Sequence, residues 1–370
     1  MCIMSSPVQK ADGKVRVIAF YLPQFHPIPE NDEWWGKGFT EWTNVAKAKT
    51  LFPGHYQPKL PADLGFYDLR VPETREAQAD LARQYGIEGF LYWHYWFGNG
   101  KMLLERPFQE VLESGKPDFP FCLGWANESW AGFWHGTNGR EILIEQKYPG
   151  KDDYIAHFNK VLPAFLDKRY IKVDGKPLFM IYRPLNNAPE ILNMMSIWKE
   201  LAAANGLEGI YFVSQTYSPD EEYAKMKEMG FDAVNVVRLF DFEEKKPSIN
   251  KLAKLKAKLL HRPTVVEYRK AARWFVDREF DSREDVIPTL IPNWDHSPRT
   301  GRRAFILHNS TPEYFAEHVS DVVDVLRDKP AEHKIAFVKS WNEWAEGNYL
   351  EPDLKFGTQY LEALQRGVSE

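Results

Sequence analysis

Short runs of apolar residues recur along the chain, and each ends in turn-forming or polar residues. Near-continuous runs rich in Val, Ile and Phe are typical of strands that are buried on both faces, as in parallel sheets. We therefore predict eight buried strands: VRVIAFYL (15–22), IEGFLYWHYW (87–96), FPFCLGWA (119–126), PLFMIYR (177–183), GIYFVSQ (209–215), AVNVVRLF (233–240), VIPTLIPNW (286–294) and KIAFVKSW (334–341).

Helical patterns separate these runs. Residues 72–86, 151–170, 190–206 and 311–329 carry apolar positions at three- and four-residue spacing, and Pro72 stands in the first turn of the first of them. Strand and helix alternate, and no GxGxxG turn follows the first strand, so a single closed (β/α)8 barrel is favoured over an open doubly wound sheet. We predict an N-terminal tail over 1–14 and one catalytic barrel over 15–370.

Two segments exceed ordinary loop length. Residues 23–70 follow the first predicted strand and residues 241–285 follow the sixth, and both are expected to decorate the mouth of the barrel. The second contains a strongly basic stretch, residues 245–273. Such a charge run is typical of a solvated helical face, and a site for an acidic or phosphorylated substrate is the alternative.

Composition narrows the classes of function. With 370 residues, of which 44% are hydrophobic and 27% charged, the chain can bury a large core, and its formal charge of −5 disfavours a general attraction to nucleic acid or membranes. No stretch has the length of a membrane span or of a signal-peptide core. Cys2 and Cys122 are too few for a disulfide framework. We expect a cytoplasmic protein, or a trimmed form of an exported one.

Aromatic residues are unusually abundant, with 13 Trp, 17 Tyr and 24 Phe. Most Phe residues fit a rich core, but the Trp residues gather in polar company, in NDEWWGKGFTEW, LYWHYWFG, GWANESWAGFWHG, IPNWDHS and SWNEWAEG. A flat apolar ring beside hydrogen-bonding groups suits the C–H faces and hydroxyls of a sugar. The expected partner is therefore a carbohydrate substrate.

Polar residues follow the ends of the predicted strands, where a barrel of this kind carries its catalytic groups. Glu343 and Glu346, in SWNEWAEG, come after the last strand and stand beside indoles, so we predict them as the catalytic carboxylates. Residues predicted to bind substrate come from the other strand ends and from the first long loop: Tyr21, Gln24, His26, Glu41, Trp42, His94, Trp125, Asn127, Glu128, Tyr182, Trp294, Asp295, Asn342 and Trp344.

Each candidate has an ordinary structural alternative. A lone Glu343 or Glu346 would be a surface carboxylate or a charge at a helix N-terminus. Glu128 fits a supporting role as well as direct chemistry, and Glu41 could simply fix its loop. His26 and His94 could be packed histidines. If the barrel reading holds, six residues should line one pocket: Tyr21, His94, Asn127, Tyr182, Trp294 and Glu343.

Other chemistries lack their sequence signatures. There is no HExxH, no paired cysteines and no EF-hand-like loop, and there is neither a GxSxG elbow nor a P-loop. We therefore expect no metal site and no cofactor.

An ordered series of motifs resembles the WbsX-like family. They are YLPQFHPIPENDEWWGKGFTEWTNV, GFLYWHYWF, FPFCLGWANESW, ILIEQ, KVDGKPLFMIYRP, NWDHSPR and SWNEWAEGNYLEPD. The resemblance spans about Val15 to Leu364. Members of that family occur in polysaccharide gene clusters and are often labelled glycosyltransferases, and they are related to the endo-α-mannanases and endomannosidases of glycoside hydrolase family 99.

The looser likeness to family 99 implies a mechanism. Those enzymes are retaining (β/α)8 hydrolases in which the sugar's 2-hydroxyl attacks C1 through a 1,2-anhydro sugar. By motif position, Glu343 would be the base on the 2-hydroxyl and Glu346 the acid/base at the leaving oxygen. Family 99 commonly has a histidine where this chain has Ala345, and the GFTEW loop belongs to the WbsX side, so the substrate does not carry over.

Residue spacing leaves the stereochemical course open. The Cβ atoms of residues three apart lie about 5–6 Å apart in a helical turn, whereas three residues of extended chain span about 10 Å. The sequence favours a glycoside hydrolase that cleaves a manno- or rhamno-configured linkage in a bacterial polysaccharide or glycan. Two alternative functions stay open. One is a glycosyltransferase of surface-polysaccharide synthesis, for which residues 245–273 are the visible candidate for binding the activated sugar donor. The other is a non-catalytic sugar-binding barrel.

Overall fold

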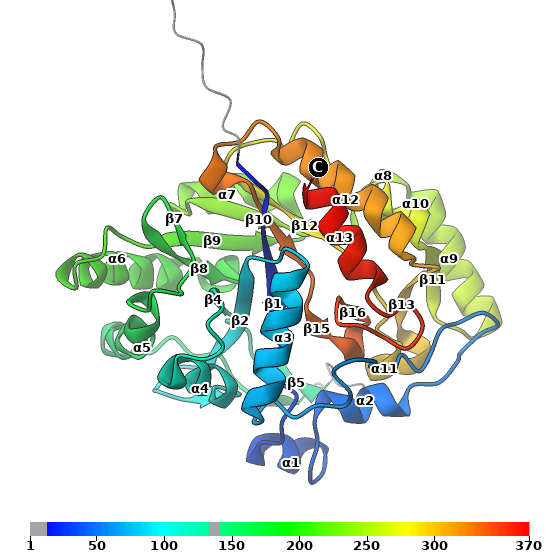
Figure 1. The fold of residues 1–370 in the computed structure, drawn as a ribbon, viewed down its shortest axis with the longest axis horizontal. Coiled ribbons are helices and arrows are strands. Elements are labelled where there is room, and N and C mark those ends of the chain that lie inside the picture. The colour runs from blue at the N-terminus through cyan, green and yellow to red at the C-terminus, as the bar shows by residue number, and fades with distance from the viewer. Residues whose placement is uncertain (1–12, 133–140, 370) are drawn as a thin grey trace, which may run out of the picture.

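The computed structural model describes residues 13–132 and 141–369, and its centre is a closed parallel barrel (Figure 1). Each barrel strand pairs with its neighbours in parallel, and β1 pairs with both β2 and β14, which closes the ring. The (β/α)8 prediction is confirmed. The barrel strands are β1 (Arg16–Tyr21), β2 (Gly89–Trp96), β4 (Phe121–Trp125), β8 (Lys176–Ile181), β9 (Tyr211–Thr216), β10 (Ala233–Val236), β12 (Val286–Leu290) and β14 (Ile335–Val338).

Three barrel strands end three or four residues earlier than their apolar runs predict. The runs 233–240, 286–294 and 334–341 continue beyond β10, β12 and β14. Their last residues leave the ladder and take backbone partners at the mouth, as when the Trp341 amide donates to the Phe20 carbonyl at 2.8 Å. The surplus residues are buried in the mouth rather than in the barrel, so hydrophobicity alone does not mark the ends of these strands.

Helices surround the barrel and bury its outer face. The four predicted helices are confirmed, three with somewhat shorter bounds and α6 shifted by two residues towards the N-terminus, whereas α4, α7 and α13 were not predicted. The surrounding helices are α3 (Pro72–Gln84), α4 (Arg106–Ser114), α5 (Lys151–Phe165), α6 (Ala188–Ala204), α7 (Pro219–Glu228), α12 (Pro312–Leu326) and α13 (Gln359–Ser369). The α13 helix packs against α12 near the C-terminus (Figure 1).

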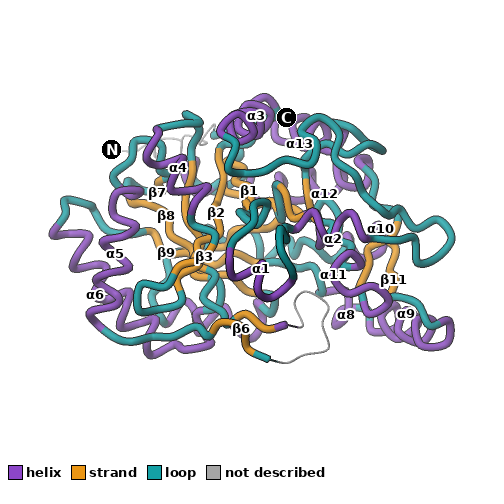
Figure 2. Tube along the Cα trace, turned by 90° about the horizontal axis from the view of Figure 1, so that it is seen from below, coloured by secondary structure: helices purple, strands orange, loops and turns teal. Residues whose placement is uncertain are grey.

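The long segments build the mouth of the barrel, as predicted. Residues 23–70 contain α1 (Pro29–Trp35) and α2 (Glu41–Lys47), and residues 241–285 contain α8 (Asp241–Lys245), α9 (Pro247–Leu260), β11 (Thr264–Glu267) and α10 (Tyr268–Ala272). Seen from the mouth in Figure 2, α1 and α2 lie in front of the strands and α9 at the periphery. A small parallel sheet joins β11 to β13 (Phe305–His308), with α11 (Ser297–Thr300) just before β13.

Short strands extend the framework at both ends of the barrel. They are β3 (Met102–Leu103), β7 (Lys172–Val173), β15 (Asn342–Glu343), β16 (Asn348–Tyr349), β5 (Trp130–Ala131) and β6 (Ile142–Ile144), with β5 paired to β6.

The predictions for the cysteines, the N-terminal tail and membrane spans can be compared with the described residues only. Cys122 is buried in β4, whereas Cys2 and most of the predicted tail lie outside the described residues. Over residues 13–132 and 141–369, no helix is both long and apolar enough to cross a bilayer.

Candidate active site

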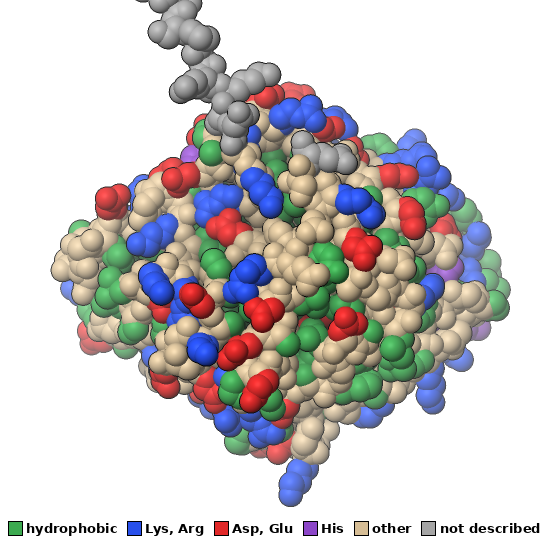
Figure 3. All heavy atoms as spheres, viewed as in Figure 1, with side chains coloured by type: hydrophobic (Ala, Val, Ile, Leu, Met, Phe, Trp, Pro, Cys, Tyr) green, Lys and Arg blue, Asp and Glu red, His purple; other side chains and the backbone are tan. Residues whose placement is uncertain are grey.

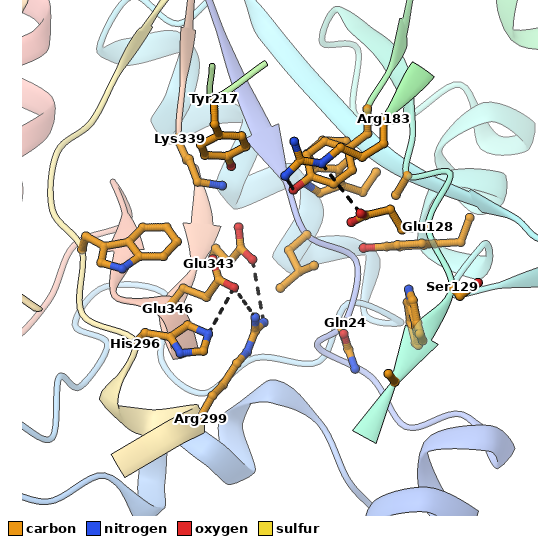
Figure 4. A pocket seen from close by; sticks show the side chains of 18 of the residues that line it. Gln24, Glu128, Ser129, Arg183, Tyr217, His296, Arg299, Lys339, Glu343 and Glu346 are labelled. Carbon is orange, nitrogen blue, oxygen red and sulfur yellow. Dashed lines mark hydrogen bonds and ion pairs between the residues drawn. The ribbon is translucent and has the colours of Figure 1, made fainter. Parts of the chain in front are cut away.

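A pocket of about 670 Å³ opens among the carboxyl ends of the barrel strands (Figure 4). Aromatic rings and charged groups share its wall. The lining residues are Leu22, Gln24, Trp93, Tyr95, Ala126, Glu128, Ser129, Trp130, Ala131, Leu143, Tyr182, Arg183, Tyr217, Phe240, Trp294, His296, Arg299, Arg303, Phe305, Lys339, Glu343 and Glu346.

A tight hairpin presents the two predicted catalytic glutamates. Glu343 ends β15, which pairs antiparallel with β16, and a 3₁₀ turn carries Glu346 between the two strands. Gly347 closes the turn at a φ of 59°, and a Cβ there would lie 2.7 Å from Asp295. The compact turn therefore brings both carboxylates into the same pocket.

Arg299 is the cation that this hairpin faces. Its guanidinium lies 2.5 Å from the Glu346 carboxylate, 3.1 Å from that of Glu41 and 3.8 Å from that of Glu343. The Arg299 side chain is only 8% exposed, and Glu41 is fully buried. Figure 4 shows Arg299 pointing from α11 towards the glutamate pair. One buried cation thus holds three carboxylates at the mouth of the barrel.

The two pocket glutamates differ in their polar contacts. Glu346 accepts hydrogen bonds from Arg299 and from the Asn348 side chain at 3.3 Å, and the His296 imidazole lies 3.6 Å away. Within the described part of the chain, the Glu343 carboxylate accepts no hydrogen bond, and Arg299 is its nearest cation. Protein side chains therefore stabilise the anionic form of Glu346 more than that of Glu343.

These contacts separate the proton affinities of the pair. Burial, together with the negative charge of Glu346, raises the pKa of Glu343 to about 8. Burial alone would also raise the pKa of Glu346, but Arg299 and His296 outweigh it and hold that pKa below its usual range. The two carboxyl groups therefore differ in proton affinity, with the pKa of Glu343 raised and that of Glu346 lowered.

Further cations and aromatic rings line the rest of the pocket. The Arg183 guanidinium stacks over the rings of Tyr182 and Tyr217, 4.5 and 4.9 Å from their centroids, and lies 3.7 Å from the Glu128 carboxylate. The Lys339 ammonium lies 5.4 Å from the centre of the Trp294 ring. Flat rings thus lie beside charged groups in this pocket.

Six of the predicted site residues line the pocket: Gln24, Glu128, Tyr182, Trp294, Glu343 and Glu346. Among the six residues expected to share one pocket, Tyr182, Trp294 and Glu343 do so, but Tyr21, His94 and Asn127 do not. Their side chains are buried beneath or beside it.

Several predicted residues instead tie the strand ends together. Asn342 exchanges two hydrogen bonds with the backbone of Leu22, at 2.8 and 3.0 Å, and Asn127 does the same with the backbone of Arg183, at 2.7 and 2.9 Å. Asp295 accepts hydrogen bonds from the side chains of His55 and Gln57. These contacts set the positions of the chain around the pocket, which sequence alone could not distinguish from sugar contacts.

The remaining predicted residues are buried behind the pocket wall. Their partners are protein groups: Tyr21 donates to Gln78, His26 contacts the Pro23 carbonyl, Trp42 donates to the Tyr67 carbonyl, His94 pairs with His157, Trp125 donates to the Trp96 carbonyl and Trp344 donates to Glu351, while Glu41 lies against Arg299.

Trp344 offers a direct test of this division between wall and support. Its ring is 1% exposed and stacks on Tyr349 with 3.8 Å between centroids. Trp344→Ala should therefore lower the free energy of unfolding by ~3–5 kcal/mol, the usual cost of deleting a buried indole. Trp294→Ala should weaken glycan binding more than it weakens the fold. Urea unfolding and calorimetric glycan titration measure both, and weakened binding by a fully stable Trp344→Ala protein would contradict this assignment.

Sequence reasoning missed part of the wall. Arg299 and Lys339 were not predicted as site residues, nor were Trp93, Trp130 and Tyr217, although all line the pocket. Arg299 lay within the NWDHSPR motif, and Trp93 and Trp130 lay within tryptophan clusters, so those three had a visible signal. Lys339 and Tyr217 had none, because each follows a strand as an isolated residue.

Comparisons with known proteins agree with this architecture. The family model described as Glycosyltransferase WbsX matches residues 17–364. A protein of Xanthomonas campestris pv. campestris (strain ATCC 33913), described as Uncharacterized protein WxcX, is 38% identical over 356 residues, and its counterpart in strain B100 is equally similar. The match covers 95% of this chain and 49% of the relative, so the chain spans about half the length of the curated relatives it matches.

Solved structures show the same fold at low sequence identity. A glycoside hydrolase-like protein superposes with a TM-score of 0.61 at 16% identity, covering 99% of this chain and 97% of that one. A GH99 endo-alpha-mannosidase from Bacteroides thetaiotaomicron superposes with a TM-score of 0.56 at 14% identity, covering 96% of each chain. At these identities the likeness establishes the barrel and leaves the reaction open.

Proposed function

This chain belongs to the Glycosyltransferase WbsX family, and we propose that it is a carbohydrate-active enzyme that hydrolyses a glycosidic bond with Glu343 and Glu346 as its acid–base pair. The observation that carries the proposal is the unequal environment of the two carboxyl groups in one aromatic-lined pocket. Burial and the charge of Glu346 raise the pKa of Glu343 to about 8, while Arg299 helps to hold the pKa of Glu346 below its usual range.

Glycosidic cleavage requires such a pair. One carboxylic acid gives its proton to the departing oxygen as the C1–O bond breaks, and one carboxylate takes a proton from the attacking hydroxyl. Water then supplies the hydroxyl that ends on C1 of the product. The unequal pKa values in the free pocket provide one group for each task at neutral pH.

The likeness to family 99 supports a finer proposal. The attacking hydroxyl would be the sugar's own 2-hydroxyl, through a 1,2-anhydro sugar, on a manno- or rhamno-configured unit of a bacterial polysaccharide. That likeness assigns leaving-group protonation to Glu346. The charges of the free site favour Glu343 instead, because Arg299 lies directly against Glu346 and holds it as an anion.

The aromatic wall supports a sugar as the substrate. Trp93, Tyr95, Trp130 and Trp294 line the pocket together with the polar side chains of Gln24 and Glu128. Ring faces can stack on the C–H surface of a pyranose while neighbouring polar groups bind its hydroxyls. A non-catalytic sugar-binding pocket would need the rings but not two buried glutamates held by one arginine.

Glycosyl transfer is the second candidate, and the cations of the pocket favour it. Arg183, Arg303 and Lys339 line the wall and could hold the phosphates of an activated sugar donor. Residues 245–273, the donor site proposed from sequence, contribute no side chain to this pocket. Transfer therefore rests on the pocket cations and on the description of the family.

Product analysis tests the proposal. The full chain is incubated with manno- and rhamno-configured bacterial polysaccharides, with and without nucleotide sugars, in water enriched in ¹⁸O. Hydrolysis should yield new reducing ends that carry ¹⁸O without any nucleotide sugar. Products that form only with a nucleotide sugar would replace hydrolysis by transfer, and tight binding without products would leave a sugar-binding barrel.

A further inference from the structure

The α9 helix (Pro247–Leu260) exposes leucines that no part of the proposed reaction uses. Leu252, Leu255, Leu259 and Leu260 are 54%, 53%, 69% and 59% exposed. The helix is attached by its other side, where Ala253 is buried and Ile249 packs against an apolar cluster with Val266 and Phe275. Exposed leucines are costly in water when they gather on one helix, and a gathered apolar surface usually marks an interaction site.

The helical repeat arranges these leucines as a stripe. At 3.6 residues per turn, Leu252, Leu255 and Leu259 fall on one face. On the same geometry, Lys251 and Lys258 flank the stripe on one side and Lys256 flanks it on the other. The outward face of α9 is therefore an apolar stripe between two lysine borders.

The charge of the surrounding segment is uniformly positive. Between residues 245 and 266 the sequence has six lysines and one arginine and no acidic residue. Lys254 pairs with Glu243 at 3.4 Å and Lys245 with Asp220 at 3.4 Å, whereas Lys251, Lys256 and Lys258 have no ion pair in the part of the chain that the structure describes. The lysines that border the stripe are thus available for an external anion.

The position of α9 allows a flat surface to reach it. The helix lies at the edge of the molecule in both Figure 1 and Figure 2, and Figure 3 shows basic and apolar side chains together along that edge. A stripe of leucines between lysines on a peripheral helix is typical of helices that lie in a membrane interface. There the apolar side chains are buried among the acyl chains, and the lysines bind lipid phosphates.

We propose that α9 binds the surface of a membrane that contains anionic lipids. Leu252, Leu255 and Leu259 enter the boundary between headgroups and acyl chains, and Lys251, Lys256 and Lys258 contact lipid phosphates. The formal charge of −5 for the whole chain does not oppose this contact, because screening limits the field of distant charges to about 8–10 Å at physiological salt. This basic stretch is then neither a plain solvated face nor a donor site.

Vesicle flotation tests the proposal with the full chain. Phosphatidylcholine vesicles with and without phosphatidylglycerol are mixed with the protein at low and high salt. We expect binding to the vesicles that contain phosphatidylglycerol, weakened at high salt. A triple Lys251→Gln, Lys256→Gln, Lys258→Gln variant should lose on the order of 10²-fold in affinity, roughly fivefold for each lysine near an anionic surface.

The leucines have a matched control. A triple Leu252→Gln, Leu255→Gln, Leu259→Gln variant should lose at least tenfold in vesicle affinity, while glutamine keeps the helix propensity close to that of leucine. The control changes three exposed leucines elsewhere, Leu166, Leu192 and Leu354, to glutamine and should bind vesicles as the unmodified chain does. Thermal melting confirms that all variants are folded.

Three outcomes would overturn the proposal. The first is that anionic vesicles leave the unmodified chain unbound at low salt. The second is that the control variant loses as much affinity as the α9 variant. The third is a dimer in light scattering that the α9 leucine changes dissociate, since the stripe would then be covered by a second copy of this chain.

Discussion

Glu343→Gln and Glu346→Gln should each lower the turnover of a natural glycan by ~10²–10⁴-fold, the range in which a general acid or base contributes to catalysis. Either change removes a group that must give or take a proton while leaving the size of the side chain unchanged. The measurement is the rate of product formation by each folded variant. Glu317→Gln is the isosteric control, because its carboxylate is 61% exposed on α12, and it should retain full turnover.

An activated aryl glycoside separates the two roles. An aryl leaving group departs with little protonation, so the variant that lacks the proton donor recovers on this substrate. In the free site the pKa of Glu343 is raised and that of Glu346 is lowered, and we therefore expect aryl release by Glu343→Gln to recover while Glu346→Gln stays impaired. Recovery of Glu346→Gln alone would instead identify Glu346 as the proton donor, as the likeness to family 99 implies. Equal recovery of both variants would contradict separate roles for the two glutamates.

The pH profile of kcat/KM gives an independent reading of the same proton. Glu343 must be protonated to act as an acid, so activity should fall as the pH rises through about 8, the raised pKa of this carboxyl group. With an aryl substrate, Glu343→Gln should lack this alkaline limb. An unchanged alkaline limb in that variant would assign the limb to another group.

Arg299→Met should lower the free energy of unfolding by ~3–5 kcal/mol at pH 7, because it removes the cation from beside three buried carboxylates. It should also lower turnover in the folded fraction, since the positive charge of Arg299, which lowers the pKa of Glu346, is then absent. Urea unfolding and rate measurements on the same preparation check both effects. Arg299→Lys keeps the charge but not the planar fork, and its loss should be smaller.

The pH dependence of this loss has a definite sign. The pKa of Glu346 in the folded chain lies below its value in the unfolded chain, so its contribution to stability is present above about pH 4.5 and disappears as the pH falls. The stability gap between the unmodified chain and Arg299→Met should therefore narrow in acid. Arg302→Met, at an exposed neighbouring position, should change stability by less than ~0.5 kcal/mol. A pH-independent gap would show that Arg299 acts through packing alone.

The barrel and the glutamate pair could be predicted from sequence, since each depends on local pattern. Buried parallel strands leave continuous apolar runs such as VRVIAFYL, and strand ends carry polar residues such as Glu343 and Glu128. The same reasoning overestimated the sugar-binding set. Trp125 and Trp344 have the composition of stacking residues, but both rings are 1% exposed and serve as support.

The sequence by itself determined the fold class, the end of the barrel that carries the pocket and the two glutamates that enter it, because strand periodicity and strand order place residues without knowledge of side-chain packing. Only the tertiary structure decided which candidates face the pocket and how the surroundings of the two glutamates differ. Arg299 lies more than 250 residues from Glu41 in the chain and meets it only after the barrel closes. Burial and neighbouring charges shift a pKa according to distance in space rather than in sequence. The pKa values of Glu343 and Glu346 therefore depend on the folded positions of Arg299 and of the two glutamates.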